Sequence, residues 1–135
     1  MVRSDDTGKF ILRVALGVLI LLHGIAKLRG GGVGGIANML SSHGVPGFVA
    51  YLVYVGEVLA PVLLIVGIYT RPAAWIVAIN MVVAIWLAHT GQLWELGKSG
   101  GWTLELQGMF LFSAIATAFL GAGRFSVGGT GGRYN

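Results

Sequence analysis

The sequence predicts an all-α fold, an integral membrane bundle of four helices, from three observations. Of the 135 residues, 56% are hydrophobic and only 10% are charged, whereas soluble domains carry about 25% charged residues. The apolar residues fall into four runs, each close to the roughly 20 residues that cross a bilayer as a helix. Glycine, proline or polar residues separate the runs, so the connections between helices are short.

The first predicted span covers residues 10–28, after a short polar lead that contains Asp5 and Asp6. Acidic residues in a first turn complement the helix dipole. The apolar run has the composition of a signal peptide core, but the residues around Lys27 make a poor cleavage site, so we expect an uncleaved span. Five glycines between positions 30 and 35 end this helix.

The second predicted span, residues 48–69, carries the most informative anomaly, because Glu57 lies inside it and Pro61 follows four residues later. A carboxylate inside a spanning helix is costly and by default marks a functional site with a partner. Proline has no N–H, so the carbonyl of Glu57 loses its intrahelical partner. We therefore expect a kink and free backbone at the depth of the acid.

The third and fourth predicted spans cover residues 73–89 and 103–120. A tight turn at Thr70–Pro72 precedes the third span, and Gly121 and Gly123 stop the fourth. The four spans form a single domain over residues 1–127. Residues 128–135 are rich in glycine and are predicted to be a flexible tail.

An even number of spans places both termini on one side of the membrane. Basic residues are more numerous on that side, six against three, and the positive-inside rule therefore predicts that both termini are cytoplasmic. The terminal side holds Arg3, Lys9, Arg13, Arg71, Arg124 and Arg133, and the opposite side holds Lys27, Arg29 and Lys98.

This topology gathers polar residues in the outer half of the bundle. Glu57 lies about nine residues deep, or roughly 14 Å at the rise of an α-helix. Every span contributes at least one polar residue at this level, and aromatic residues supply walls. The predicted ligand-binding pocket consists of His23, Lys27, Tyr54, Glu57, Trp86, His89, Glu105 and Phe112.

Helical spacing predicts which faces of the spans turn inward. On the fourth span, the expected inward stripe consists of Glu105, Gly108, Met109, Phe112, Ala116 and Phe119. Asn80 is nine residues from His89, close to half a turn away, and Gln107 is about 200° from Glu105. We therefore expect Asn80 and Gln107 to bond between helices or to a partner protein instead of facing the pocket.

Composition excludes several classes of function. Cysteine is absent, which excludes disulfides, Cys-ligated metal sites and thiol–disulfide exchange by this chain. The formal net charge is only +4 and no basic cluster is present, so we expect no nucleic-acid partner.

Several segments together resemble the DoxX family, over about residues 10–127. They are the stretch from Arg13 to Lys27 with Gly17 and Gly24, the Glu57 segment that ends in Gly67-Ile68-Tyr69-Thr70-Arg71, and the last span, which opens near Glu105 and ends Gly121-Ala122-Gly123-Arg124-Phe125-Ser126. The resemblance implies a small four-helix protein of the bacterial or archaeal plasma membrane. It also implies relatives among subunits of thiosulfate:quinone oxidoreductase and proteins of quinone or oxidative stress.

Two functions are favoured by these residues and by the resemblance. One is a structural or assembly subunit of a membrane redox complex, with Glu57 paired to Lys27 or Arg13. The other is binding of a quinone-like ligand, with Glu57 and His89 as the candidate catalytic pair that exchanges protons. Whether the chain is itself an enzyme stays open, and an accessory subunit of an oxidoreductase complex is favoured over a stand-alone enzyme.

Two further classes remain. His23, Glu57, His89 and Glu105 are candidate ligands for a non-haem metal, and His23 and His89 for a haem b, although no span carries the Glu-x-x-His motif of di-iron bundles. Transport of a small solute would require a homo-oligomer. The expected partners are membrane lipids and either other proteins of a membrane complex or further copies of this chain.

Overall fold

The computed structural model describes residues 4–30, 32–88 and 90–135, and these residues are mainly helical. Their strand pairing is limited to an isolated bridge between Leu96 and Trp102. In chain order the elements are α1 (Ser4–Arg29), α2 (Gly34–Ser42), the 3₁₀-helix η1 (Gly47–Tyr51), α3 (Leu52–Tyr54), the π-helix η2 (Val55–Leu59), α4 (Ala60–Val66), α5 (Thr70–Ala88), the 3₁₀-helix η3 (Thr90–Gln92) and α6 (Glu105–Leu120).

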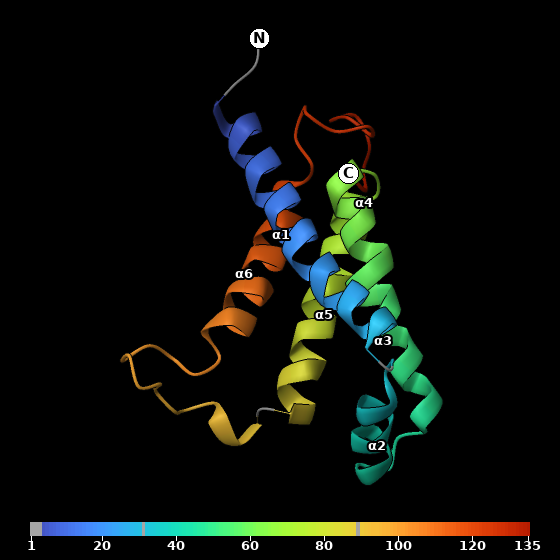
Figure 1. Ribbon diagram of the computed structural model, residues 1–135. Helices are drawn as coiled ribbons and strands as arrows, with labels where there is room; N and C mark the ends of the chain where they lie inside the picture. Colours follow the sequence, from blue (N-terminus) through green and yellow to red (C-terminus); the bar gives the residue numbers. More distant parts are fainter. Residues whose placement is uncertain (1–3, 31, 89) are drawn as a thin grey trace.

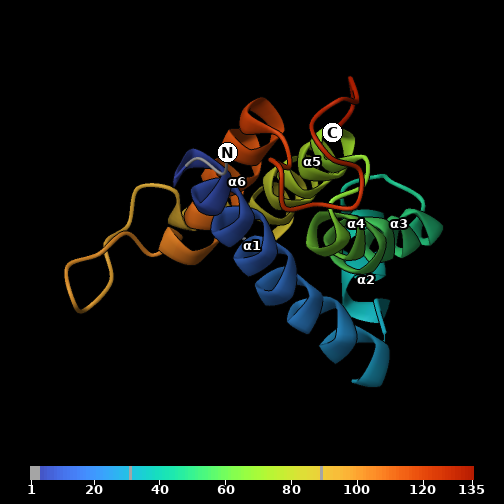
Figure 2. The same cartoon turned by 90° about the horizontal axis from the view of Figure 1, so that it is seen from above.

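The long helices alternate in direction, as Figure 1 shows. α1 and α5 run toward the end of the molecule that holds α2, and α4 and α6 run back. The start of α1 and the C-terminal segment therefore lie at the same end (Figure 1). Seen from above in Figure 2, α1 crosses the group formed by the other long helices, and it packs against both α4 and α6.

Three helices in the described part of the chain are long and apolar enough to cross a membrane: Ser4–Arg29, Gly47–Val66 and Thr70–Leu87. The second runs without a break from η1 to α4. α6 is apolar but has only 16 residues. The predicted all-helical fold with several apolar helices is thus confirmed for the described residues. It is consistent with a membrane helical bundle, and three of the four predicted spans are long and apolar enough to cross a membrane.

The connection before α5 differs from the sequence prediction. Thr70–Pro72 does not form a turn but begins α5, where the missing N–H of Pro72 has no helical partner to lose. The turn lies earlier, at Gly67 and Tyr69, which both have positive φ, 84° and 48°. Glycine tolerates this conformation without strain.

The expected backbone irregularity near Pro61 is a π-helical turn. Residues Val55–Leu59 form this turn directly before α4, and Glu57 lies at its centre. Gly24 of α1 packs so closely that a Cβ at this position would overlap the carbonyl oxygen of Glu57. Two turns earlier in α1, a Cβ at Gly17 would lie 2.9 Å from the carbonyl oxygen of Pro61. The two glycines therefore let α1 lie directly on the irregular segment.

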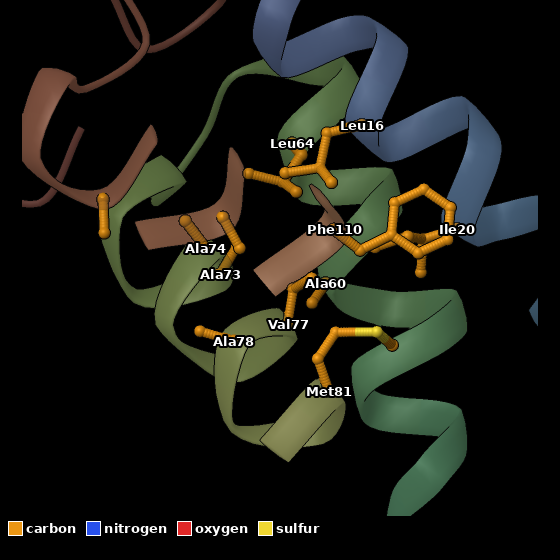
Figure 3. Packing of buried hydrophobic residues seen from close by; sticks show 12 residues of the cluster. Leu16, Ile20, Ala60, Leu64, Ala73, Ala74, Val77, Ala78, Met81 and Phe110 are labelled. Carbon is orange, nitrogen blue, oxygen red and sulfur yellow. The ribbon is translucent and has the colours of Figure 1, made fainter. Parts of the chain in front are cut away.

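The hydrophobic core lies where α1, α4, α5 and α6 meet (Figure 3). Leu16 and Ile20 of α1 pack with Leu64 of α4, Val77 of α5 and Phe110 of α6. Alanines fill most of the remaining core positions. Small side chains allow the close helix approach on which packing within a membrane depends.

Two buried or half-buried arginines complete the helix ends opposite α2. Arg13, which is fully buried, donates from Nη1 to the carbonyl oxygens of Leu64 and Ile65 in the last turn of α4. Arg71 donates from Nη1 to Ala118 and Phe119 in the last turn of α6. The last carbonyls of a helix have no intrahelical partner, and in a membrane an unpaired group costs several kcal/mol. Each arginine therefore caps the C-terminus of a neighbouring helix.

The C-terminal segment folds back onto these helix ends. The Asn135 side chain accepts hydrogen bonds from the backbone N–H of Thr70 at 3.2 Å and from its hydroxyl at 2.8 Å. Asn135 is only 8% exposed, and Arg13 also donates to the carbonyl of Phe125. These contacts differ from the expectation of a flexible tail over residues 128–135.

The predicted inward stripe of the last helix is wrong in most of its length. Met109, Phe112 and Phe119 are all more than 60% exposed. Gly108 of the predicted stripe is buried as expected, but the other buried residues of α6 are Phe110, Ala114, Thr117 and Ala118. α6 is apolar on every side, so helical spacing alone does not distinguish a lipid-facing side from a packed side.

The glycine contact gives a direct test of the packing between α1 and the π-helical turn. Gly24→Ala places a methyl group against the Glu57 carbonyl and is expected to lower the free energy of unfolding by about 1–3 kcal/mol, as overpacking does. Gly8→Ala in the same helix is the control. No atom lies within 4 Å of its Cβ position, so helix propensity predicts about 0.5–1 kcal/mol of added stability. Unfolding in one detergent measures both variants, and equal effects would contradict the close contact.

Candidate functional site

The candidate site centres on Glu57, whose carboxylate lies in the π-helical turn and is 8% exposed. Lys27 of α1 donates to its Oε1, with Nζ and Oε1 2.6 Å apart. The Lys27 side chain is itself only 28% exposed. Charged side chains inside a membrane protein are usually paired with one another in this way.

A third helix joins this pair. The Nδ2 of Asn80 in α5 donates to Oε2 of Glu57 at 3.3 Å. Gly56 makes room for it, because a Cβ there would lie 2.8 Å from Cβ and Cγ of Asn80. Lys27, Glu57 and Asn80, called here the polar network, therefore link α1, η2 and α5.

The polar network borders two chambers. The first, the α6-side chamber, has a volume of about 140 Å³ and is lined by Ile20, His23, Lys27, Glu57, Met81, Ala84, Leu106, Gln107 and Phe110. The second, the α2-side chamber, has about 150 Å³ and is lined by Lys27, Ile36, Met39, Val53, Glu57, Asn80, Val83, Ala84 and Leu87. Lys27, Glu57 and Ala84 belong to both, so the ion pair lies between them.

Three of the predicted pocket residues meet at the α6-side chamber: His23, Lys27 and Glu57. The His23 ring lies edge-on to Phe110, with ring centroids 5.8 Å apart. Sequence reasoning placed Asn80 and Gln107 away from the pocket, but Asn80 bonds to Glu57 and Gln107 lines the chamber. The nine-residue spacing relates Asn80 only to His89 at the helix end, whereas Glu57 lies level with Asn80 itself. The interhelical hydrogen bond expected of Asn80 is present.

The other predicted residues lie apart from this chamber. Glu105 is the exposed first residue of α6, and Phe112 is 62% exposed. Trp86 is exposed and packs against His43 at the end of α2, with ring centroids 4.8 Å apart. Tyr54 is half-buried and lies near Tyr51, with ring centroids 6.5 Å apart. His89, the proposed proton-transfer partner of Glu57, lies outside the described residues.

The described residues supply no ligand set for the metal hypothesis, and the haem hypothesis stays a prediction because His89 lies outside them. Among residues 4–30, 32–88 and 90–135, no three His, Asp or Glu side chains lie close enough together to hold a metal ion. His23 and Glu57 line one chamber, while Glu105 is exposed at the start of α6. Glu105 thus lies apart from His23 and Glu57, and the predicted metal site as a whole stays a prediction because His89 lies outside the described residues.

In the described part of the chain, apolar helices of membrane-spanning length pack around a buried ion pair, which is the class of a small helical membrane protein. More specifically, the chain belongs to the DoxX family, whose family model matches residues 8–90. The matched region contains Lys27, Glu57 and Asn80, and therefore the whole polar network.

One relative has a name that describes an activity. It is "Putative oxidoreductase CatD" of Bacillus subtilis (strain 168), to which this chain is 32% identical over 85 residues. The match covers 63% of this chain and 62% of the relative. This chain therefore spans less than two thirds of the length of that protein. No solved structure was found to match the chain.

The ion pair yields a stability prediction. Lys27→Met leaves a buried carboxylate without its cation and should lower the free energy of unfolding by about 3–5 kcal/mol. The double variant Lys27→Met/Glu57→Gln removes both charges and should recover part of this loss. Lys9→Met is the control, since Lys9 Nζ lies 3.9 Å from Oδ2 of Asp5, whose side chain is 53% exposed, and a pair with such an exposed carboxylate is worth about 0–1 kcal/mol. A double variant less stable than Lys27→Met would show that the two side chains are not coupled.

Proposed function

We propose that this protein is a membrane subunit of an oxidoreductase-type complex and that its role there is structural or in assembly. The polar network carries the proposal, because both oxygens of Glu57 are engaged, one by Lys27 and one by Asn80. Such a network holds α1, η2 and α5 in one register. The name of the CatD relative supports the redox context.

We further propose a topology of four spans in a prokaryotic plasma membrane with both termini in the cytoplasm. α6 then crosses together with the residues that flank it. The two helix-capping arginines, Arg13 and Arg71, lie at the end of the molecule that holds the start of α1 and the C-terminal segment. Basic residues at this end favour its cytoplasmic placement.

The assembly role predicts the behaviour of Glu57→Gln. Because the neutral amide loses the ion pair with Lys27, we expect the variant to recover at most about a tenth of the wild-type yield of partner proteins on purification in mild detergent. Glu105→Gln makes the same chemical change at the exposed start of α6 and should retain the partners.

Quantitative mass spectrometry of the protein purified in mild detergent gives the readout. A Glu57→Gln variant that keeps its partners in wild-type amount but loses the redox activity of the complex would refute the assembly role. That outcome would favour the second candidate function.

The second candidate is binding of a quinone-like ligand in the α6-side chamber, with Glu57 as a proton-handling group. The observation in its favour is the convergence of His23, Lys27 and Gln107 on a chamber otherwise lined by apolar side chains. An apolar pocket with a few convergent polar groups is the usual form of a small-molecule site. A pairing of Glu57 with His89 remains a hypothesis here.

Binding in this chamber predicts thermal stabilisation. A short-chain quinone at 100 times its Kd should add about 2.7 kcal/mol to the stability of the wild-type protein. It should also quench part of the fluorescence of the four tryptophans. Gln107→Leu keeps the volume of the chamber lining and removes a hydrogen-bonding group, so it should weaken binding. If neither signal responds to the quinone, this second function is rejected.

A further inference from the structure

A third cavity is a groove that borders the α2-side chamber and shares no residue with the α6-side chamber. It has no role in either function above. It has a volume of about 300 Å³ and runs between the second span and α5, with α2 at one end. That volume is at the lower end of the range for small-molecule sites, about 300–1,000 Å³. We call it the lateral groove.

The lining of the lateral groove is almost wholly apolar. Ile76, Ile79, Val83 and Leu87 form one wall at helical spacing along α5, and Leu52 lies on the facing wall. Leu52, Ile79 and Val83 are also exposed. In a chain that spans a membrane, an exposed apolar rim faces lipid, so the groove opens sideways into the bilayer.

The lateral groove ends at the polar network. Asn80 lies in its lining, and the groove shares five residues with the α2-side chamber that contains Lys27 and Glu57. The shared residues are Ile36, Val53, Asn80, Val83 and Leu87. The Oδ1 of Asn80 lies 2.9 Å from the Cβ position of Gly56, which also lines the groove. A molecule with its chain in the groove would therefore place its head beside Asn80 and the ion pair.

The chemistry of this inner end selects the head group. Glu57 accepts hydrogen bonds, and its four lone-pair positions exceed the two donors that Lys27 and Asn80 supply. The amide of Asn80 both donates and accepts. A carboxylate head would meet the buried negative charge of Glu57, which like-charge repulsion disfavours. A hydroxyl head remains uncharged and can donate to Glu57 while it accepts from Asn80.

We infer that the lateral groove binds a single-chain lipid with a hydroxyl head, of the long-chain alcohol type, that enters from the bilayer. The hydrocarbon tail of the lipid lies between α5 and the second span, and its hydroxyl forms hydrogen bonds with the polar network. The inference uses the same network as the proposed subunit role, but retention of a lipid by the purified chain does not depend on partner proteins. The two proposals can therefore fail separately.

The test titrates the full chain in detergent with 1-dodecanol and counts bound molecules by native mass spectrometry. We expect saturation at one molecule per chain. Three molecules of the same carbon number serve as comparisons. Dodecanoate has an anionic head, 2-dodecanone has a head that only accepts hydrogen bonds, and dodecane has no polar head. Each should bind about tenfold more weakly, the effect of one hydrogen bond to a charged group.

A matched pair of variants locates the site. Val83→Phe fills the groove from its exposed rim and occupies the space of the bound alcohol. It should therefore weaken 1-dodecanol binding about tenfold or more. Val82→Phe makes the same change at the neighbouring exposed residue, which is not part of the groove lining, and should leave binding unchanged. Both variants keep Lys27, Glu57 and Asn80, so partner assembly should be unaffected.

Several results would overturn the inference. One is the lack of saturable binding of 1-dodecanol. Equal binding of dodecane would show that the polar network does not select the head. Equal loss in Val82→Phe and Val83→Phe would place the bound alcohol on the general lipid-facing surface.

Discussion

The structure depends on one constraint, which is that the carboxylate of Glu57 lies in an apolar bundle and must be paired. Lys27 reaches it from α1 and Asn80 reaches it from α5. Both approaches require small residues, since Gly24 brings α1 onto the Glu57 backbone and Gly56 admits Asn80. Two glycines, one π-helical turn and three polar side chains thus form a single unit, and a change in any of them affects the others.

The backbone obeys the same rule as the side chains. Helix ends within a membrane protein leave carbonyl groups that water does not reach. Arg13 and Arg71 satisfy such groups at the ends of α4 and α6, and the C-terminal segment adds further bonds through Asn135. Charged side chains therefore hold the helices together at two places. The Lys27–Glu57 ion pair lies near α2, and the two helix-capping arginines lie at the opposite end.

Much of this could be predicted from the sequence, because a charged residue in an apolar run is a strong signal. Glu57, a basic partner that is either Lys27 or Arg13, and an irregular backbone near Pro61 all follow from that signal, and the structure selects Lys27. The inward face of α6 could not be predicted, since a uniformly apolar helix has no amphipathic pattern. The partners of Arg13 were also inaccessible to sequence reasoning, because they are backbone carbonyls that any residue provides. The contact of Asn80 could not be predicted from its spacing to His89, because its hydrogen-bond partner Glu57 lies on another helix.

The account of function rests on the polar network, whether the protein acts as a subunit, a ligand-binding protein or both. The most direct measurement is solid-state NMR of the protein in lipid bilayers, with ¹⁵N at the lysine Nζ and ¹³C at the glutamate carboxylates. The account predicts one strong dipolar coupling, corresponding to the 2.6 Å contact between Lys27 Nζ and Glu57 Oε1, that disappears in Glu57→Gln. A wild-type spectrum without this coupling, or a coupling that persists in the variant, would contradict the central claim.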